Sequence, residues 1–187
     1  MAASIRQLSI PGAFVAEPRR ADDHRGWFFE SWRESDYAAA GVEAPFVQDN
    51  LSCSLRNVVR GLHYQAQGAQ GQLVTIVTGR VFDVIVDMRL GSPTFGHHET
   101  RILDEAAPAQ FYMPPGVAHG YCVLSDSAIL HYKCTKYYDP TTERGLRWND
   151  PSVAIAWPVE NPVIAPRDAA FPLLNDIPQT ALAVFAG

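Results

Sequence analysis

Several classes of protein are excluded by what this sequence has little of. Its 15 Lys and Arg residues against 20 Asp and Glu give a net charge of −5, so no general electrostatic attraction draws it to nucleic acid or to an anionic membrane. No apolar run approaches the ~18 residues of a membrane-spanning helix, and the N-terminus has no signal-peptide pattern. The three cysteines, Cys53, Cys122 and Cys134, lack metal-ligand spacing and are expected to be small buried residues in a reducing compartment. The sequence therefore predicts a cytoplasmic protein without a nucleic-acid or membrane partner.

The length of 187 residues predicts one domain over residues 1–187, with a core at about 10–175 and a tail at 176–187. Its 13 Gly and 14 Pro residues separate short runs rich in Val, Ile, Thr, Tyr and Phe, which is typical of strands. The expected strands are 13–17, 27–32, 46–50, 57–65, 73–77, 81–88, 99–103, 110–114, 119–124 and 128–138. A helix is expected only at 33–41, ending at Gly41. About ten short strands in one domain predict an all-β sandwich or jelly-roll barrel, whose mouth and interior suit a small-molecule site.

Two neighbouring strands, 73–77 and 81–88, are joined by a short connection that contains Gly79. Such a connection predicts a β-hairpin. In the second strand the two-residue period separates two faces. One face has Phe82, Val84, Val86 and Met88, and the other has Val81, Asp83, Ile85 and Asp87. Carboxylates on an otherwise apolar face line either a polar cavity or solvent, and solvent is the ordinary expectation.

Two strands contain residues suited to proton transfer. In RGLHYQ at 60–65, Gly61 indicates a bulge or a close backbone approach that lets Arg60 and His63 point into the same space. His63 is therefore a candidate general base, although a histidine hydrogen-bonded within the barrel wall is the simpler interpretation. In the strand at 128–138, Tyr132 shares a face with apolar residues. It is either a buried structural tyrosine or a proton donor opposite an imidazole.

The segment YMPPGVAHGY at 112–121 resembles the second motif of cupins through Pro114, Gly116 and His119. In metal-binding cupins that histidine is a ligand, together with an H-x-H and a Glu of the first motif. Here the first motif corresponds to His63-Tyr64-Gln65, so Gln replaces the second histidine. One histidine per strand does not supply the three or four ligands of a catalytic metal, and we expect no metal site.

Longer stretches of the chain, taken in order, resemble the dTDP-4-dehydrorhamnose 3,5-epimerase family. They are DDHRGWFFESW, FVQDNLSCS, VVRGLHYQ, VFDVIVDMRLGSPTFG, FYMPPGVAHGYCVLSD, YKCTKYYDPTTERGLRWNDP and APRDAAFPLL. The resemblance implies a metal-free, cofactor-free cupin jelly roll with one or two short helices, and a homodimer. It also implies a substrate, the dTDP-linked 4-keto-6-deoxy sugar dTDP-4-dehydro-6-deoxy-glucose, and a place in dTDP-rhamnose biosynthesis.

The same resemblance implies roles for individual residues. His63 of RGLH is the base that removes the C3 and C5 protons, Asp168 of APRD orients it, and Tyr132 of the YK pair returns a proton to the opposite face. Tyr138 is expected to stack on thymine, and Arg25 to hold the nucleotide. The positions implied to bind substrate are Arg25, Glu30, Gln48, Asp49, Asn50, Arg60, Gln72, His119, Tyr138, Glu143 and Arg167.

One position departs from the family pattern. The family typically reads QGKL where this chain reads QGQL, so Gln72 stands where a lysine is expected to stabilise an enolate. Either the enzyme is slower, or another cation such as Arg60 compensates, or the substrate differs. The alternatives are a C3- or C5-only epimerase on the same or another nucleotide-linked 4-keto sugar, and a non-catalytic sugar-nucleotide-binding homologue. A 3,4-ketoisomerase on the same fold fits the motifs less well.

Overall fold

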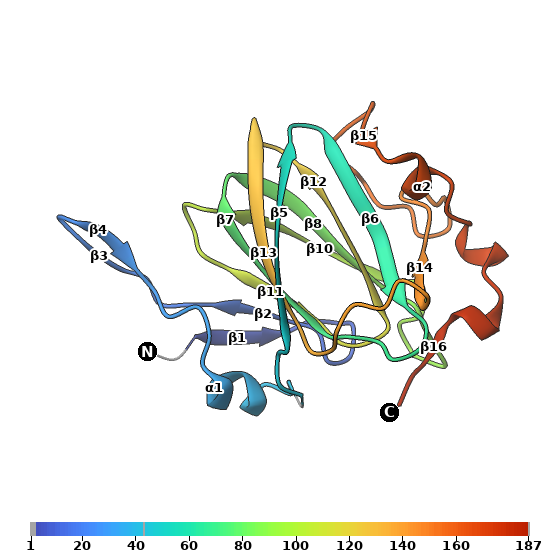
Figure 1. The fold of residues 1–187 in the computed structure, drawn as a ribbon, viewed down its shortest axis with the longest axis horizontal. Coiled ribbons are helices and arrows are strands. Elements are labelled where there is room, and N and C mark those ends of the chain that lie inside the picture. The colour runs from blue at the N-terminus through green and yellow to red at the C-terminus, as the bar shows by residue number, and fades with distance from the viewer. Residues whose placement is uncertain (1–2, 43, 187) are drawn as a thin grey trace.

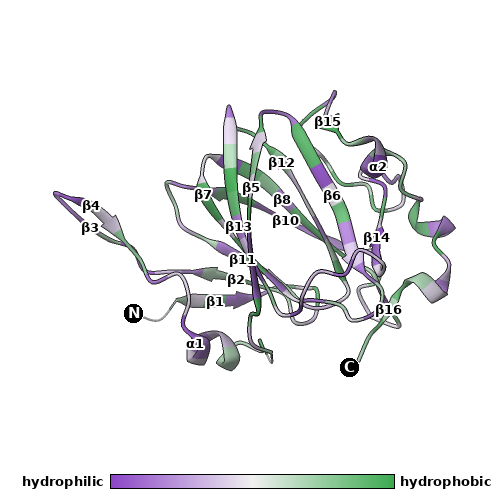
Figure 2. Cartoon of the chain, in the orientation of Figure 1, coloured by the Kyte–Doolittle hydropathy of each residue, from purple (hydrophilic) through white to green (hydrophobic). Residues whose placement is uncertain are grey.

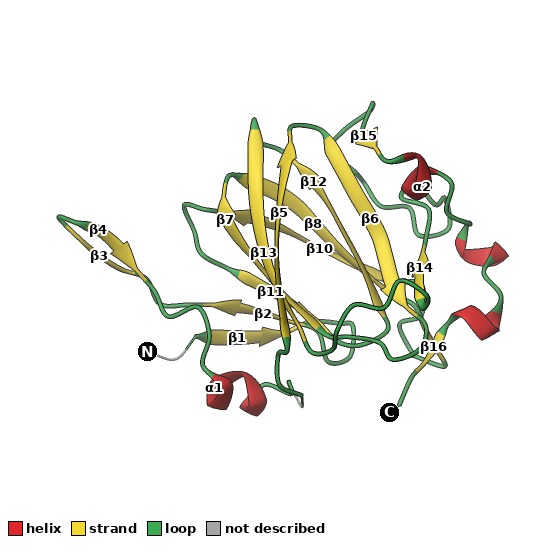
Figure 3. Cartoon of the chain, viewed as in Figure 1, coloured by secondary structure: helices red, strands yellow, loops and turns green. Residues whose placement is uncertain are grey.

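The computed structural model describes residues 3–42 and 44–186, and most regular structure in them is antiparallel β-sheet (Figures 1 and 3). The first sheet has the strand order β1 (Ser4–Gln7), β2 (Phe14–Glu17), β11 (Gln110–Met113), β7 (Gln72–Thr78), β13 (Ser127–Cys134), β5 (Gln48–Leu55). The second has the order β10 (His98–Asp104), β8 (Arg80–Asp87), β12 (Val117–Val123), β6 (Val58–Gln65), β14 (Glu143–Gly145), and β15 (Val163–Ile164) pairs with β6. These two facing sheets confirm the predicted all-β jelly roll.

Shorter elements lie around the two sheets. Strands β3 (Ala21–Asp23) and β4 (Gly26–Phe28) form a hairpin that projects away from the barrel (Figure 1). Near the C-terminus, β16 (Ala183–Val184) pairs with β9 (Arg89–Leu90). The helices are α1 (Glu34–Ala39) and α2 (Pro166–Ala169), and 3-10 turns lie at Leu174–Asp176 and Gln179–Ala181. Among the described residues, no helix is long and apolar enough to cross a membrane.

Strand β8 shows how the alternating pattern builds the core. Val81 and Ile85 belong to a cluster between the sheets, together with residues of the first sheet such as Phe111. The alternate residues, including Val84 and Val86, pack on the other side against the C-terminal third of the chain. Strand β8 therefore has two buried faces, and Figure 2 shows it among the apolar strands of the barrel. The predicted separation of faces in 81–88 is confirmed.

The predicted hairpin of 73–77 and 81–88 is wrong. Strand β7 pairs with β11 and β13 in the first sheet, whereas β8 pairs with β10 and β12 in the second. The turn between them crosses from one sheet to the other through Gly79, which has φ +87° and no room for a Cβ beside the Ser127 carbonyl oxygen. Each of the two strands is hydrogen-bonded along both edges within its own sheet, so neither has a free edge for the other.

Other local predictions succeed in part. The helix at 33–41 is α1, and Gly41 follows it with φ +104°, as expected of a glycine that ends a helix. The strand expected at 27–32 ends at Phe28, the one at 128–138 ends at Cys134, and the one at 46–50 begins at Gln48 and continues to Leu55. Two of the three cysteines are buried, but Cys53 is exposed, because it lies on the outer face of the edge strand β5.

Candidate active site

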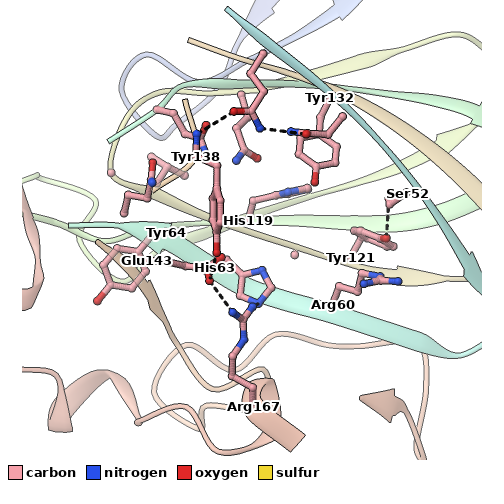
Figure 4. Close-up of a pocket in the computed structure, with 18 residues that line it drawn as sticks. Ser52, Arg60, His63, Tyr64, His119, Tyr121, Tyr132, Tyr138, Glu143 and Arg167 are labelled. Atoms are coloured by element: carbon pink, nitrogen blue, oxygen red, sulfur yellow. Dashed lines mark hydrogen bonds and ion pairs between the residues drawn. The ribbon is translucent and has the colours of Figure 1, made fainter. Parts of the chain in front are cut away.

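A cavity of about 360 Å³ lies between the two sheets, and most of the chemically active side chains point into it (Figure 4). The sequence predicted many of its lining residues, namely Gln48, Asn50, Arg60, His63, Gln72, His119, Tyr132, Tyr138, Glu143 and Arg167. The other lining residues with polar side chains are Ser52, Tyr64, Gln65, Gln70 and Tyr121. Strands far apart in the sequence therefore contribute to one site.

His63 on β6 is held by a buried carboxylate. Asp168 on α2 is only 3% exposed, and its Oδ1 lies 2.9 Å from His63 Nε2. Its Oδ2 accepts a hydrogen bond of 3.1 Å from the Gly61 N–H. Burial disfavours the carboxylate charge, but the hydrogen bond and charge of His63 and the bond from Gly61 outweigh it, so the pKa of Asp168 lies below its ordinary value. The predicted base and its orienting carboxylate are in contact.

Gly61 allows the neighbouring side chains to share the cavity. It has φ +113°, and a Cβ there would lie 2.6 Å from both Gly120 Cα and the His119 carbonyl oxygen. The pairing of β6 with β12 shifts register at this point, which is the irregularity predicted from the sequence. Arg60 and His63 consequently both line the cavity despite their opposite nominal parity.

Tyr132 approaches the cavity from the other sheet, on β13. Burial raises the pKa of its phenol, and the neighbouring Cys134 and Tyr121 add to the shift, whereas Arg60 opposes it. In the described part of the chain its hydroxyl has no hydrogen-bond partner. Tyr132 therefore offers a neutral, unengaged O–H to a molecule in the cavity.

A second histidine–carboxylate pair lies beside the first. His119 on β12 is the register partner of His63 on β6, and its Nε2 lies 3.0 and 3.1 Å from the two carboxylate oxygens of Asp83. Asp83 is fully buried. The expectation that its face of the strand meets solvent is wrong, because that face points into the barrel, toward the first sheet. The carboxylates on the alternating face were the signal that pointed to this residue.

The mouth of the cavity has a polar network. Tyr138 donates a hydrogen bond of 2.9 Å to Glu143, and Arg167 donates one of 2.6 Å to the same carboxylate oxygen. The Tyr138 backbone N–H donates to Gln48, which in turn donates to Asn50. Arg167 also lies over the ring of Phe171. These contacts orient an aromatic ring and a guanidinium at the entrance, groups suited to stacking on a planar ring and to binding an anion.

Three predicted binding residues lie outside this cavity. Asp49 points to the outer face of β5, where its carboxylate pairs with Lys133 at 2.9 Å. It alternates with Gln48 and Asn50, so it cannot share their side of the strand. Arg25 lies at the turn of the β3–β4 hairpin and pairs with Asp23. Glu30 follows that hairpin and pairs with Arg33.

The cavity has guanidinium groups but no lysine. Lysine occurs in the sequence only at positions 133 and 136, and neither lines the cavity. Gln72 does line it, so an amide stands where an ammonium group was expected. Within residues 3–42 and 44–186, no group of three or more His, Cys, Asp or Glu side chains is arranged to hold a metal ion.

Known proteins resemble the chain over nearly its whole length. The family model of dTDP-4-dehydrorhamnose 3,5-epimerase matches residues 7–176. An enzyme of that name from Neisseria gonorrhoeae is 45% identical over 89% of this chain, although the chain spans only 51% of that relative's length. One from Pseudomonas aeruginosa is 46% identical over 87% of this chain and 91% of its own. A dTDP-4-dehydrorhamnose 3-epimerase from Streptomyces niveus is 42% identical over 88% of this chain and 80% of its own.

Among solved structures, the dTDP-6-deoxy-D-glucose-3,5-epimerase of Legionella pneumophila, in complex with dTDP-4-keto-L-rhamnose, superposes with a TM-score of 0.95. It is 44% identical, and the match covers 99% of this chain and 100% of the other. Similarity at this level extends to the whole fold.

Proposed function

The chain belongs to the dTDP-4-dehydrorhamnose 3,5-epimerase family, and on this basis we propose that its cavity inverts C3 and C5 of dTDP-4-dehydro-6-deoxy-glucose. One observation carries the proposal. The cavity has a carboxylate-held imidazole, His63, on one sheet and the unengaged phenol of Tyr132 on the other. A base and an acid on two walls of one cavity are what inversion at carbon requires.

The reaction needs an acidic C–H bond, which the C4 ketone of the sugar supplies. His63 takes the proton from C3, and the electron pair of that bond moves into a C3–C4 double bond, leaving the negative charge on the C4 oxygen. Tyr132 then gives its proton to C3 from the opposite face, and the ketone re-forms. The same exchange at C5 completes the double inversion. Between the two inversions, His63 gives its proton to water and the Tyr132 phenolate takes a proton from water. Both groups thereby return to their starting states.

Asp168 supports His63 in both states of this cycle. Its carboxylate fixes the ring by Nε2 and balances the positive charge that the ring gains on accepting a proton. Because its pKa is held below the ordinary value, Asp168 stays ionised at neutral pH. The half-buried phenol of Tyr132 also stays protonated at neutral pH, since its pKa is raised. Both groups are therefore in the protonation state that their roles require.

A direct test follows deuterium incorporation. The purified protein is incubated with dTDP-4-dehydro-6-deoxy-glucose in D2O, with a reductase present to trap product, and C3 and C5 are followed by NMR. We expect label and inversion at both carbons, and loss of both in His63→Ala. Label at C3 alone would instead make this chain a C3-epimerase, the activity named for the Streptomyces niveus relative. Binding of dTDP without any label would make it a non-catalytic homologue.

Residues of the projecting hairpin are explained by a homodimer. Arg25, the exposed Trp27 and the exposed Phe28 extend away from their own barrel (Figure 1), so they reach a nucleotide only in the cavity of a second copy. The edge strand β5 exposes Leu51 and Leu55, an apolar strip that suits such a contact. We also retain the cytoplasm as the proposed location, consistent with the two free buried thiols.

Mixing two inactive variants tests the shared site. His63→Ala inactivates a cavity, and Arg25→Ala inactivates the hairpin that we assign to the other copy. Each mixed dimer then has one complete site of its two. Because about half of the dimers are mixed after random exchange of equal amounts, about one quarter of the wild-type rate returns. Mixed variants that stay inactive after subunit exchange, or an unmixed protein that is monomeric by light scattering, would refute the arrangement.

A further inference from the structure

Asp83 is a buried carboxylate with no role in the proton transfers described above. It lies on β8, the second strand of its sheet, and is fully inaccessible to solvent. Within the described residues its side chain has one partner, His119, whose Nε2 lies 3.0 and 3.1 Å from its two oxygens. A buried carboxylate is costly unless its charge is balanced, so its pairing with an imidazole in the active cavity calls for an explanation.

The pair fixes where the histidine carries its hydrogens. Burial raises the pKa of Asp83, and the charge and hydrogen bond of His119 oppose that shift. A carboxylate can only accept hydrogen bonds, so the nitrogen facing it, Nε2, is the donor. The other ring nitrogen, Nδ1, has no partner among the described residues, and the ring lines the cavity. Figure 4 shows His119 between His63 and Tyr132, where the reacting part of a substrate would lie.

The enolate formed in the reaction needs a donor at the C4 oxygen. Gln72 has no charge to offer, and neither lysine of the chain reaches the cavity. Of the two guanidinium groups, Arg167 is already paired with Glu143 at the mouth, and Arg60 donates through Nε to Ser54. Apart from the terminal NH2 groups of Arg60 and the base His63, His119 is the cavity group able to donate with a positive charge, and a buried carboxylate of its own holds it there.

We propose that Asp83 is a positioning residue: it holds His119 by Nε2 and balances a doubly protonated ring, whose Nδ1–H donates a hydrogen bond to the C4 oxygen of the substrate. The inference rests on the proposed function. No proton leaves His119. As the C–H electron pair moves into the new double bond, the carbonyl pair moves onto the C4 oxygen, and the imidazolium stabilises that charge there.

The first experiment is the Asp83→Asn substitution, which removes the charge of the side chain and keeps its shape. We expect kcat to fall about 10–100-fold, with little change in KM, because a neutral amide still orients the ring but no longer balances its charge. The alkaline limb of the kcat profile should move to lower pH. Besides His119 itself, the titratable groups that line the cavity are Arg60, His63, Tyr64, Tyr121, Tyr132, Tyr138, Glu143 and Arg167, and all of them are kept in this variant.

Asp87→Asn is the matched control. Asp87 lies on the same strand, is equally buried, and pairs with Arg89 at 2.8 Å away from the cavity. Asp87→Asn should lower the stability of the fold as Asp83→Asn does, but it should leave the pH profile of kcat unchanged. An Asp83→Asn profile that does not move, or a loss of kcat that merely follows the folded fraction as in the control, would overturn the inference.

A second measurement needs neither a variant nor turnover. The 15N NMR shifts of the His119 ring in the wild-type protein with dTDP bound report which nitrogens carry hydrogen. Hydrogen on both nitrogens at neutral pH supports the inference, and an unprotonated Nε2 or Nδ1 overturns it. Absence of label in the D2O experiment would refute the proposed function separately, since the NMR result does not depend on activity.

Discussion

Replacing Asp168 by Asn is the sharpest test of how the base is held. The substitution keeps the size of a residue that is 3% exposed but removes its charge and one of its two acceptor oxygens. Either Gly61 or His63 then faces an NH2 group in place of an oxygen, so one buried donor loses its partner. Hydrogen bonds to a charged acceptor contribute ~1.5–3 kcal/mol each. We therefore expect the free energy of unfolding at pH 7 to fall by about 3 kcal/mol.

The effect on catalysis should exceed the effect on stability. An amide that replaces the orienting carboxylate leaves His63 free to take the wrong tautomer and does not balance the imidazolium. We expect kcat to fall about 10²–10⁴-fold, as in related His–carboxylate pairs. Asp168 does not line the cavity, so dTDP affinity should change little. The assays are deuterium incorporation at C3 and C5, calorimetry of dTDP binding and thermal denaturation.

The pH dependence supplies an independent check. The pKa of Asp168 is lowered in the folded protein, so its ionised form stabilises the fold at every pH above the unfolded value of about 3.9. That contribution disappears as the pH falls through the lower, folded value. The difference in stability between wild type and Asp168→Asn should therefore be constant near neutrality and shrink below about pH 4. A variant that keeps more than about one tenth of kcat, or a stability difference that persists in acid, would refute the reasoning.

Three further outcomes are expected. Tyr132→Phe should lower inversion far more than label exchange, because His63 still removes the proton, and equal loss of both would argue against a donor role. Gly61→Ala should destabilise the fold by several kcal/mol and abolish activity, because the new Cβ would lie 2.6 Å from Gly120 Cα and the residue has φ +113°. A variant that is active and as stable as wild type in denaturant unfolding would contradict this. Arg167→Ala should raise KM about tenfold or more with a smaller fall in kcat, because the guanidinium lies at the mouth. Steady-state kinetics showing a pure kcat effect would place it in the chemistry instead.

The sequence alone determined the faces of the strands, the positions of the irregular glycines and the residues available for catalysis. Alternation with a period of two residues depends only on strand geometry, so the two faces of β8 were predictable from Val81 and Val84 onwards. Gly41 and Gly61 marked a helix end and an irregular strand for conformational reasons that act within a few residues. The motifs around His63 and Tyr132 pointed to one cavity, and both residues line it.

Only the tertiary structure decided what each face meets. Whether Asp83 reaches water or an imidazole depends on which strand pairs with β8, and His119 on the paired strand β12 lies 36 residues further along the chain. The neighbouring strands β7 and β8 do not pair, because each is flanked on both edges by other strands, in two different sheets, a choice that no local pattern contains. The projection of the hairpin that carries Arg25 away from the barrel likewise had no signal in the local sequence pattern. Local patterns set which side chains share a face, and long-range packing sets what lies opposite them.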